Sequence, residues 1–310
     1  MMKPENPMGD FDISFITVNF RTPQLVDGLI SSIRKNPPPA SFEIIVVDND
    51  SGDGSAEKIR TRYPDIRLIE LPKNAGFGAG NNRGVEKASG KFLALINSDC
   101  EVAEESFGPA LEYIQRNPGV GIIGLRTFKP SGEIEQSARG FPDPSTGLFG
   151  RSTFLGKLAQ KGKGGLGKSS LAKKNLLVDP SKTEPYDVDW VAGTMMLISR
   201  ECWDAVNGFD EGFFMYWEDA DICCRAKEKG FRTVYFPGGR IIHKAGSSAS
   251  SNPSRSIRFF HQSAYRYVAK HISPGFTPLR VFAWTALNLR ATLLIVKAGA
   301  AKSGKGPKAS

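Results

Sequence analysis

A carboxylate and an amide follow a short apolar run in the first third of the chain. Residues 92–96 are apolar and too few for an ordinary helix, so they predict a strand buried on both faces. Asn97, Ser98 and Asp99 come directly after it. Ligands of open α/β sheets bind at the carboxyl ends of the strands, and a carboxylate there suits a divalent cation that holds phosphate oxygens. The competing interpretation is a turn that caps the next helix.

Two earlier strand ends could hold a planar base. Asn19 and Phe20 end a first predicted strand. Asp48 directly follows the second predicted strand, at residues 43–47. Together they offer aromatic stacking and hydrogen bonds to a base edge. The Asp-Gly-Ser composition of residues 48–55 is also typical of ordinary turns.

A glycine-rich segment spans residues 74–84, and we expect a loop over 74–80 that leads into a helix at 81–89. The glycines allow a close backbone approach, and the helix N-terminus offers free N–H groups to an anion. The spacing is not that of a dinucleotide fingerprint, so NAD binding is not favoured.

Three carboxylates, Glu218, Asp219 and Asp221, gather after Trp217 at the start of a predicted helix. Capping by acidic side chains would explain them, because the helix dipole stabilises negative charge there. The functional alternative is a general base in the same crevice as Asp99.

His243 ends a late predicted strand and is a candidate metal ligand, although single histidines are commonly structural. Trp190 and Trp217 offer flat faces for sugar rings, with core packing as the alternative. Gly193 interrupts a predicted strand where another group could approach closely.

Strands and helices alternate from residue 12 to 126, which predicts an α/β fold with a doubly wound, mainly parallel sheet. We expect a hairpin at 127–135, a mobile Gly/Ser/Lys-rich loop at 143–185, and helices at 256–271 and 279–297 after further strands.

The net charge of +9 is unevenly distributed. Residues 151–182 carry eight Lys/Arg and one Asp, and residues 297–310 carry four Lys, so the remainder is nearly neutral. This favours anionic lipid or phosphate partners over nucleic acid. The four cysteines form no disulfide-framework spacing, and residues 1–12 lack the apolar core of a signal peptide, so we expect a cytoplasmic protein.

Residues 162–169 match the P-loop pattern of ATP-binding proteins. That motif needs a buried strand directly before it, and residues 154–161 are not apolar enough. ATP binding is therefore an alternative, and we expect the loop to close over the acceptor side instead.

The predicted helix at 279–297 is apolar but contains Arg280 and Arg290. Arginine near the centre of a spanning helix is costly, so a helix lying at the membrane surface fits better, helped by the lysine tail. Packing on the domain or in an oligomer interface is the alternative.

From about residue 12 to 271 the chain resembles the family 2 inverting glycosyltransferases of the GT-A fold, most closely the bacterial rhamnosyltransferase-like members. The resemblance rests on residues 47–55 (VDNDSGDGS), 74–84 (NAGFGAGNNRG), 95–99 (LINSD), 191–198 (VAGTMMLI), 208–214 (GFDEGFF), 218–221 (EDAD) and His243, in that order. It implies a GT-A (Rossmann-like) mixed, mainly parallel sheet flanked by helices, with C-terminal helices.

The resemblance also implies roles for the candidate residues. Asp219 would be the catalytic base, and Asp99 with His243 would hold Mn²⁺ or Mg²⁺. The nucleotide would bind at Asn19, Asp48, Asp50, Gly76, Asn82, Asn97 and Ser98. The acceptor would contact Trp190, Gly193, Trp217 and Glu218. The family has Asp-x-Asp where this chain has Asn97-Ser98-Asp99, which leaves one fewer charge for the metal.

The implied organisation has five parts: an N-terminal extension (1–11), a nucleotide-sugar-binding half (12–126), an acceptor-binding half (127–250), C-terminal helices (251–297) and a disordered basic tail (298–310). The expected reaction moves a sugar such as L-rhamnose from a dTDP- or UDP-sugar to a glycan or polyprenyl-linked acceptor in cell-surface polysaccharide synthesis. We expect the reaction to occur at the inner face of the cell membrane, with peripheral membrane contact. The sequence motifs leave the oligomeric state undetermined.

Two rival functions remain. A nucleotidyltransferase would need a glycine-rich loop bearing Lys or Arg after the first strand, and residues 18–23 are not one. A non-catalytic nucleotide- or sugar-binding partner of a membrane assembly would not need Asp99, Asp219 and His243, and measurement of donor hydrolysis would distinguish it.

Overall fold

A computed structural model describes residues 11–142, 176–244, 253–275 and 277–303. They fall into two compact units. One unit, here called the body, comprises Met1–Phe141, Leu176–Glu211 and Glu218–Ser247. The other, the C-terminal unit, comprises Pro142–Asn175, Gly212–Trp217 and Ser248–Ser310. The predicted P-loop at 162–169 and most of the predicted loop at 143–185 lie outside the described residues.

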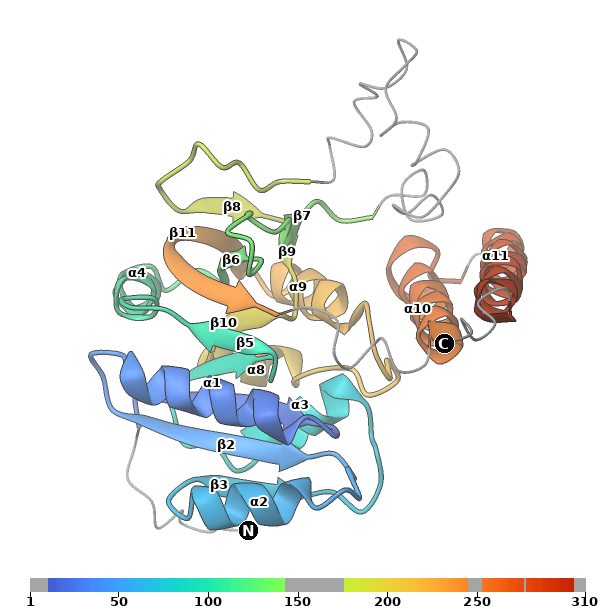
Figure 1. The fold of residues 1–310 in the computed structure, drawn as a ribbon. Coiled ribbons are helices and arrows are strands. Elements are labelled where there is room, and N and C mark those ends of the chain that lie inside the picture. The colour runs from blue at the N-terminus through green and yellow to red at the C-terminus, as the bar shows by residue number, and fades with distance from the viewer. Residues whose placement is uncertain (1–10, 143–175, 245–252, 276, 304–310) are drawn as a thin grey trace, which may run out of the picture. The chain divides into compact units, whose positions relative to one another are not determined.

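The first half of the body alternates strands with helices, as predicted (Figure 1). Its elements are β1 (Ile13–Asn19), α1 (Pro23–Lys35), β2 (Phe42–Asp48), α2 (Ser55–Arg62), β3 (Arg67–Glu70), α3 (Phe77–Val85) and β4 (Phe92–Ile96). The strands pair in parallel in the order β3-β2-β1-β4. Their carboxyl ends therefore meet at one edge of the sheet.

The second half extends the same sheet. Its elements are β5 (Cys100–Val102), α4 (Gly108–Arg116), β6 (Val120–Phe128), β7 (Ala138–Arg139), β8 (Tyr186–Val188), β9 (Trp190–Val191), β10 (Met195–Ser199), α8 (Arg200–Val206), α9 (Glu218–Glu228) and β11 (Arg232–His243). In the described residues the sheet has nine strands, ordered β3-β2-β1-β4-β10-β6-β11-β5 with β8 beside β11. Strand β10 runs antiparallel to both neighbours, so the predicted mixed, mainly parallel α/β fold is confirmed.

Apolar side chains fill both faces of the sheet. One cluster joins β1 residues such as Phe15 to helices α1, α2 and α4. The other joins Ile16, the next residue, to α3, α8 and α9. Because neighbouring strand residues point to opposite faces and both faces are covered, the central strands are apolar along most of their length.

Several elements differ from the predictions. Helix α3 begins at Phe77, inside the segment predicted to be a loop. The three-residue strand β5 was not predicted. The late predicted strand that ends at His243 is the twelve-residue strand β11, which shifts register between Phe236 and Ile241. The predicted hairpin at 127–135 closes through an antiparallel bridge between Phe128 and Ile134.

The glycines of the 74–84 segment let α3 pack tightly on the sheet. A Cβ on Gly80 would lie 3.0 Å from Val18, and one on Gly84 would lie 2.4 Å from Ile16. Both neighbours are side chains of β1. These two glycines are therefore required by helix–sheet packing.

The C-terminal unit contains helix α10 (Pro253–Tyr267), a π-helical turn η1 (Val268–Ile272) and helix α11 (Thr277–Ser303). Helix α11 packs against α10 and continues six residues beyond its predicted end at 297. The short segment Gly212–Trp217 belongs to the same unit, where Trp217 packs on Phe260 and Tyr267 of α10.

Candidate active site

The sheet brings Asp99 and His243 together. Asp99 lies in the turn between β4 and β5, and His243 ends β11 opposite Cys100 of β5. The backbone N–H of Lys244 donates to the Asp99 carbonyl at 2.8 Å. As a result, the Nε2 atom of His243 lies 3.4 Å from Oδ1 of Asp99. Residues separated by 144 positions thus form one site through strand pairing.

Glu135 completes this site, and sequence reasoning missed it. Its Oε2 atom lies 2.9 Å from Nδ1 of His243. The backbone N–H of Glu135 donates to Thr127 at the end of the predicted hairpin, which fixes the carboxylate beside β11. No motif contains Glu135 and no spacing links it to His243. Only the parallel pairing of β6 with β11 could have revealed the contact.

The surroundings of His243 determine its protonation. Burial acts to lower the imidazole pKa, but hydrogen bonds to Asp99 and Glu135 and the charges of both acids outweigh it. Together these effects raise the pKa of His243 to about 9. The imidazole is therefore protonated at neutral pH when no other cation neutralises the two carboxylates.

This donor set fits a divalent cation. A carboxylate oxygen and an imidazole nitrogen are both ligands that Mn²⁺ accepts, and Mg²⁺ accepts the carboxylate. A metal-ligating histidine usually donates its second N–H to a carboxylate, which fixes the tautomer. Glu135 supplies that carboxylate at Nδ1, so Nε2 is left to face Asp99.

The predicted base-binding residues form a buried hydrogen-bonded group. Asn19 and Asp48 stand opposite each other on β1 and β2, and the Asn19 amide donates to Oδ1 of Asp48 at 2.6 Å. Ser51 donates to Asp48 through both its hydroxyl and its backbone N–H. The hydroxyl of Thr22 lies 3.2 Å from that of Ser98. The group at β1 and β2 is thereby connected to the turn that carries Asp99.

The other predicted nucleotide residues surround this group. Asp50 is exposed in the loop after β2, with a left-handed φ of 61°. The carbonyl of Gly76 accepts a hydrogen bond from the Asn49 side chain, which ties the start of α3 to β2. The N–H of Asn97 donates to Thr194 before β10. All three lie beside the carboxyl ends of the parallel strands.

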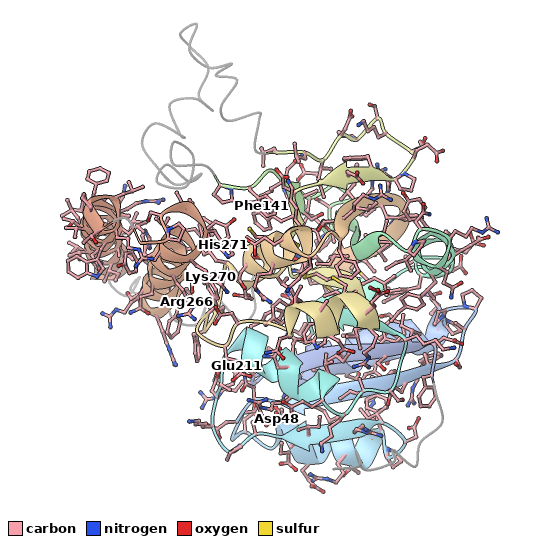
Figure 2. The ribbon with its side chains drawn as sticks, turned by 180° about the vertical axis from the view of Figure 1, so that it is seen from behind. Asp48, Phe141, Glu211, Arg266, Lys270 and His271 are labelled. Carbon is pink, nitrogen blue, oxygen red and sulfur yellow. The ribbon has the colours of Figure 1, made fainter. Side chains whose placement is uncertain are left out.

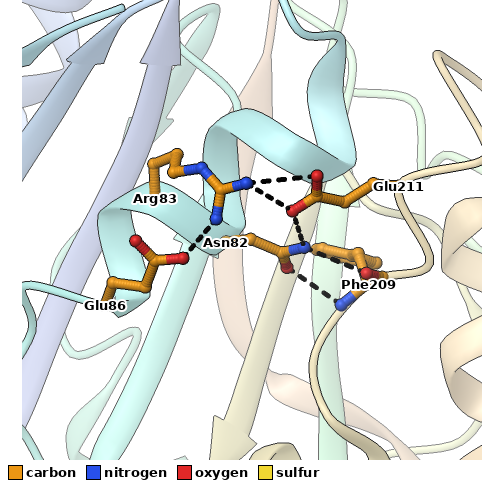
Figure 3. Close-up of polar contacts among 5 residues, drawn as sticks. All are labelled: Asn82, Arg83, Glu86, Phe209 and Glu211. Carbon is orange, nitrogen blue, oxygen red and sulfur yellow. Dashed lines mark hydrogen bonds and ion pairs between the residues drawn. The ribbon is translucent and has the colours of Figure 1, made fainter.

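Asn82 makes a different set of contacts (Figure 3). Its side-chain amide donates to the Phe209 carbonyl and to Glu211 at 3.0 Å, and its side-chain oxygen accepts from the Phe209 N–H at 2.9 Å. Arg83 adds an ion pair to Glu211. Asn82 therefore holds the segment that leads to Glu218 and Asp219 against helix α3.

Asp219 is fixed by two backbone N–H groups. Its Oδ2 accepts from Gly193 at 3.0 Å and its Oδ1 from Ala220 at 2.8 Å. A Cβ on Gly193 would lie 3.6 Å from Cβ of Asp219, an ordinary contact, so the space around Gly193 does not itself require glycine. Burial raises the pKa of Asp219, while these N–H groups and the charge of Arg139 limit that rise. A carboxylate with a raised pKa is suited to accept a proton.

The two other acids of the motif, Glu218 and Asp221, are buried. Glu218 is buried, and burial together with the charge of Asp219 raises its pKa well above the usual range. Its Oε2 has no hydrogen-bond partner among the described residues. Asp221 is fully buried and forms an ion pair with Arg225 at 2.7 Å. Its role is therefore structural, within the interior of the body.

The two predicted sugar-stacking tryptophans have structural contacts. The Trp190 indole N–H donates to the Gly140 carbonyl at 3.0 Å, and Arg139 lies over its ring. Trp217, in the C-terminal unit, has a left-handed φ of 70°, following Tyr216 at 71°. Such backbone conformations are costly for large residues and occur preferentially at functional sites.

Comparison with known proteins identifies the family of the chain. Residues 14–168 match the family "Glycosyl transferase family 2", and residues 181–259 match "Glycosyltransferase like family 2". The N-acetylglucosaminyl-diphospho-decaprenol L-rhamnosyltransferase of Mycobacterium tuberculosis is 28% identical over 81% of this chain and 83% of its own length. The rhamnosyltransferase WbbL of Escherichia coli is 30% identical over 63% of this chain and 70% of its own length.

The fold is shared with solved glycosyltransferases. A Pyrobaculum calidifontis mannosyltransferase, solved with GDP-Man and Mn²⁺, superposes with a TM-score of 0.56 at 17% identity. The match covers 98% of this chain and 78% of that one. The chain is a glycosyltransferase and belongs to glycosyl transferase family 2.

Proposed function

We propose that the protein transfers a sugar, with L-rhamnose as the leading candidate, from a dTDP- or UDP-linked donor to a lipid-linked saccharide in cell-surface polysaccharide synthesis. The observation that supports this most strongly is the Asp99–His243–Glu135 group beside the buried Asn19–Asp48 pair. The two rhamnosyltransferase relatives support the choice of sugar, and the diphospho-decaprenol in one of their names supports the acceptor class.

In this proposal the donor nucleotide binds at the carboxyl ends of β1, β2 and β4. Asp48 and Asn19 orient the base, and Asp99 and His243 hold a divalent cation. The cation, when bound, offsets the negative charge that develops on the leaving diphosphate.

Asp219 acts as the general base. It takes the proton of an acceptor hydroxyl as that oxygen attacks the anomeric carbon, while the bond to the diphosphate breaks on the opposite face. Bond formation and cleavage in one displacement invert the anomeric centre. The hydrogen bonds from Gly193 and Ala220 keep the carboxylate oriented for this transfer.

Calorimetric titration with UDP and dTDP, each with and without Mn²⁺ or Mg²⁺, tests the donor site. We expect metal-dependent binding that Asp99→Ala abolishes, with the preferred base narrowing the donor. Asp187→Ala is the matched control, since Asp187 is an exposed acid whose partner Arg232 begins β11, at the opposite end of that strand from His243. Absence of binding to either nucleotide, with tight ATP binding instead, would overturn the proposal.

Transfer itself is tested with Asp219→Asn. We expect nucleotide binding to persist and the turnover rate to fall about 10²–10⁴-fold, which is the usual contribution of a general base. An unchanged rate would assign the proton transfer to another group.

A further inference from the structure

Helix α11 exposes an apolar surface to solvent. The large apolar side chains that the described residues leave exposed all lie on it, each 54–65% exposed: Val281, Phe282, Trp284, Leu289, Leu293 and Val296. Spacings of seven, eleven and fourteen residues from Phe282 place Leu289, Leu293 and Val296 on one side of the helix. We call this exposed set the apolar face of α11.

The opposite side of α11 already has its partner. Ala283, Leu287 and Ala291 recur every fourth residue and are buried within the C-terminal unit, where α11 packs on α10. The guanidinium of Arg280 donates to the carbonyls of Ser273 and Ala269, which fixes the start of α11 to η1. The apolar face is therefore not needed to hold the unit together.

Polar side chains on the exposed side are satisfied within the helix. Thr285, Asn288 and Thr292 each donate to the carbonyl four residues earlier, at 2.8–2.9 Å. Side chains bonded in this way do not depend on water for those donors, as is required in an apolar medium.

The charge around the apolar face has one sign. No Asp or Glu occurs after Glu228, whereas residues 253–310 contain ten Lys and Arg. Arg266 and Lys270, one helical turn apart, come from the α10–η1 segment (Figure 2), and Lys297 is exposed on α11 itself. A polybasic segment of this kind is attracted to anionic lipid head groups.

We propose that the apolar face of α11 inserts into the surface of a membrane that contains anionic lipids, with the helix axis parallel to the bilayer. Residues Thr277–Gly299 are long and apolar enough to cross a membrane. A crossing helix would carry Arg280 and Arg290 into the hydrocarbon, which is costly, together with the charged helix α10 to which it is packed. Dimerisation through the apolar face would place the basic surfaces of two copies against each other, which is unfavourable because like charges repel.

Flotation of the full-length protein with lipid vesicles tests this surface. We expect recovery with vesicles that contain phosphatidylglycerol and little recovery with pure phosphatidylcholine. Leu289→Glu should lower the bound fraction by about ten-fold, because it places a carboxylate in the inserted face. Gln262→Glu is the matched control, since it adds the same charge at an exposed position of α10 and should retain binding.

Three outcomes would overturn the proposal. The first is a dimer in analytical ultracentrifugation that Leu289→Glu dissociates, without vesicle binding by the wild type. The second is protein that alkaline carbonate cannot release from vesicles, which would indicate a crossing helix. The third is loss of vesicle binding in both glutamate variants. The proposal needs no catalytic residue, so nucleotide titration of Leu289→Glu separates its failure from failure of the proposed glycosyltransferase site.

Discussion

Glu135 lies outside every motif and contacts the proposed metal site through His243. Its contact with Nδ1 of His243 sets which ring nitrogen faces Asp99. We expect Glu135→Ala to weaken Mn²⁺ binding by about 10–100-fold, the usual effect of losing such a partner. Glu135→Gln keeps an acceptor oxygen and should lose less.

The neighbouring Glu133 provides the control for this prediction. It is exposed and pairs with Lys129 on the same hairpin, so Glu133→Ala should leave Mn²⁺ affinity unchanged. The measurement is Mn²⁺ titration followed by electron paramagnetic resonance. Equal losses in Glu133→Ala and Glu135→Ala would indicate damage to the hairpin instead of a specific contact with His243.

The protonation of His243 predicts a pH dependence of metal binding. Two carboxylates raise its pKa to about 9 in the metal-free fold, against an ordinary value of about 6.5. A metal bound by His243 needs the neutral imidazole, so we expect Mn²⁺ binding at the proposed site to release a proton below pH 9. Affinity should therefore rise with pH by up to about ten-fold per unit and level off near pH 9.

The same shift stabilises the metal-free fold, with the opposite dependence on pH. The raised pKa of His243 adds folding stability that is complete below about pH 6.5 and is lost as the pH rises through 9.

Calorimetric titration with Mn²⁺ between pH 6.5 and 8.5, in buffers of different ionisation enthalpy, counts the protons released on metal binding. A flat affinity across this range would show that His243 does not bind the metal.

Helix α3 shows where elements could and could not be predicted. Length and composition identified most strands, because apolar runs of five to seven residues bounded by polar turns are too short for an ordinary helix. Glycine is a weak helix former, so residues 77–80 predict a loop. Packing of α3 onto β1 overrides that preference, and no local signal reports it. The three-residue strand β5 was equally hidden, because its pairing with β11 depends on a residue range far away in sequence.

Gly84→Ala tests this packing explanation. Alanine favours a helix by about 1 kcal/mol over glycine. Its Cβ would however lie 2.4 Å from Ile16 and 3.2 Å from Val47. Overpacking of a core typically costs about 1–3 kcal/mol, so after the helix gain we expect a net loss of up to about 2 kcal/mol in urea unfolding.

Gly119→Ala is the matched control, since nothing lies within 4 Å of a Cβ there. It should change the free energy of unfolding by less than about 0.5 kcal/mol, as is usual for surface substitutions. If Gly84→Ala were as stable as the wild type, the glycine would instead be serving the bound ligand, as its place in the glycine-rich motif first indicated.

The candidate site as a whole was only partly predictable. Asp48, Asp99, Asp219 and His243 could be chosen as candidates because each lies within a motif, at or just after the end of a strand or in the first turn of a helix. The order of the strands was not readable, and it is this order that places β11 beside β5 and thus His243 beside Asp99. Contacts that depend on the strand order of the whole sheet cannot be read from local patterns.

The division into two units predicts where ligand binding is felt. Every residue proposed to hold the metal and the nucleotide belongs to the body, and none to the C-terminal unit. A ligand at 100 times its dissociation constant stabilises the form that binds it by about 2.7 kcal/mol. Hydrogen exchange with saturating Mn²⁺ and dTDP or UDP should therefore slow in β1, β4 and β11 and remain unchanged in α11. Asp99→Ala should abolish the slowing, whereas Leu289→Glu should leave it intact. Equal slowing in α11 would show that the two units respond as one, and would assign the C-terminal unit a part in donor binding.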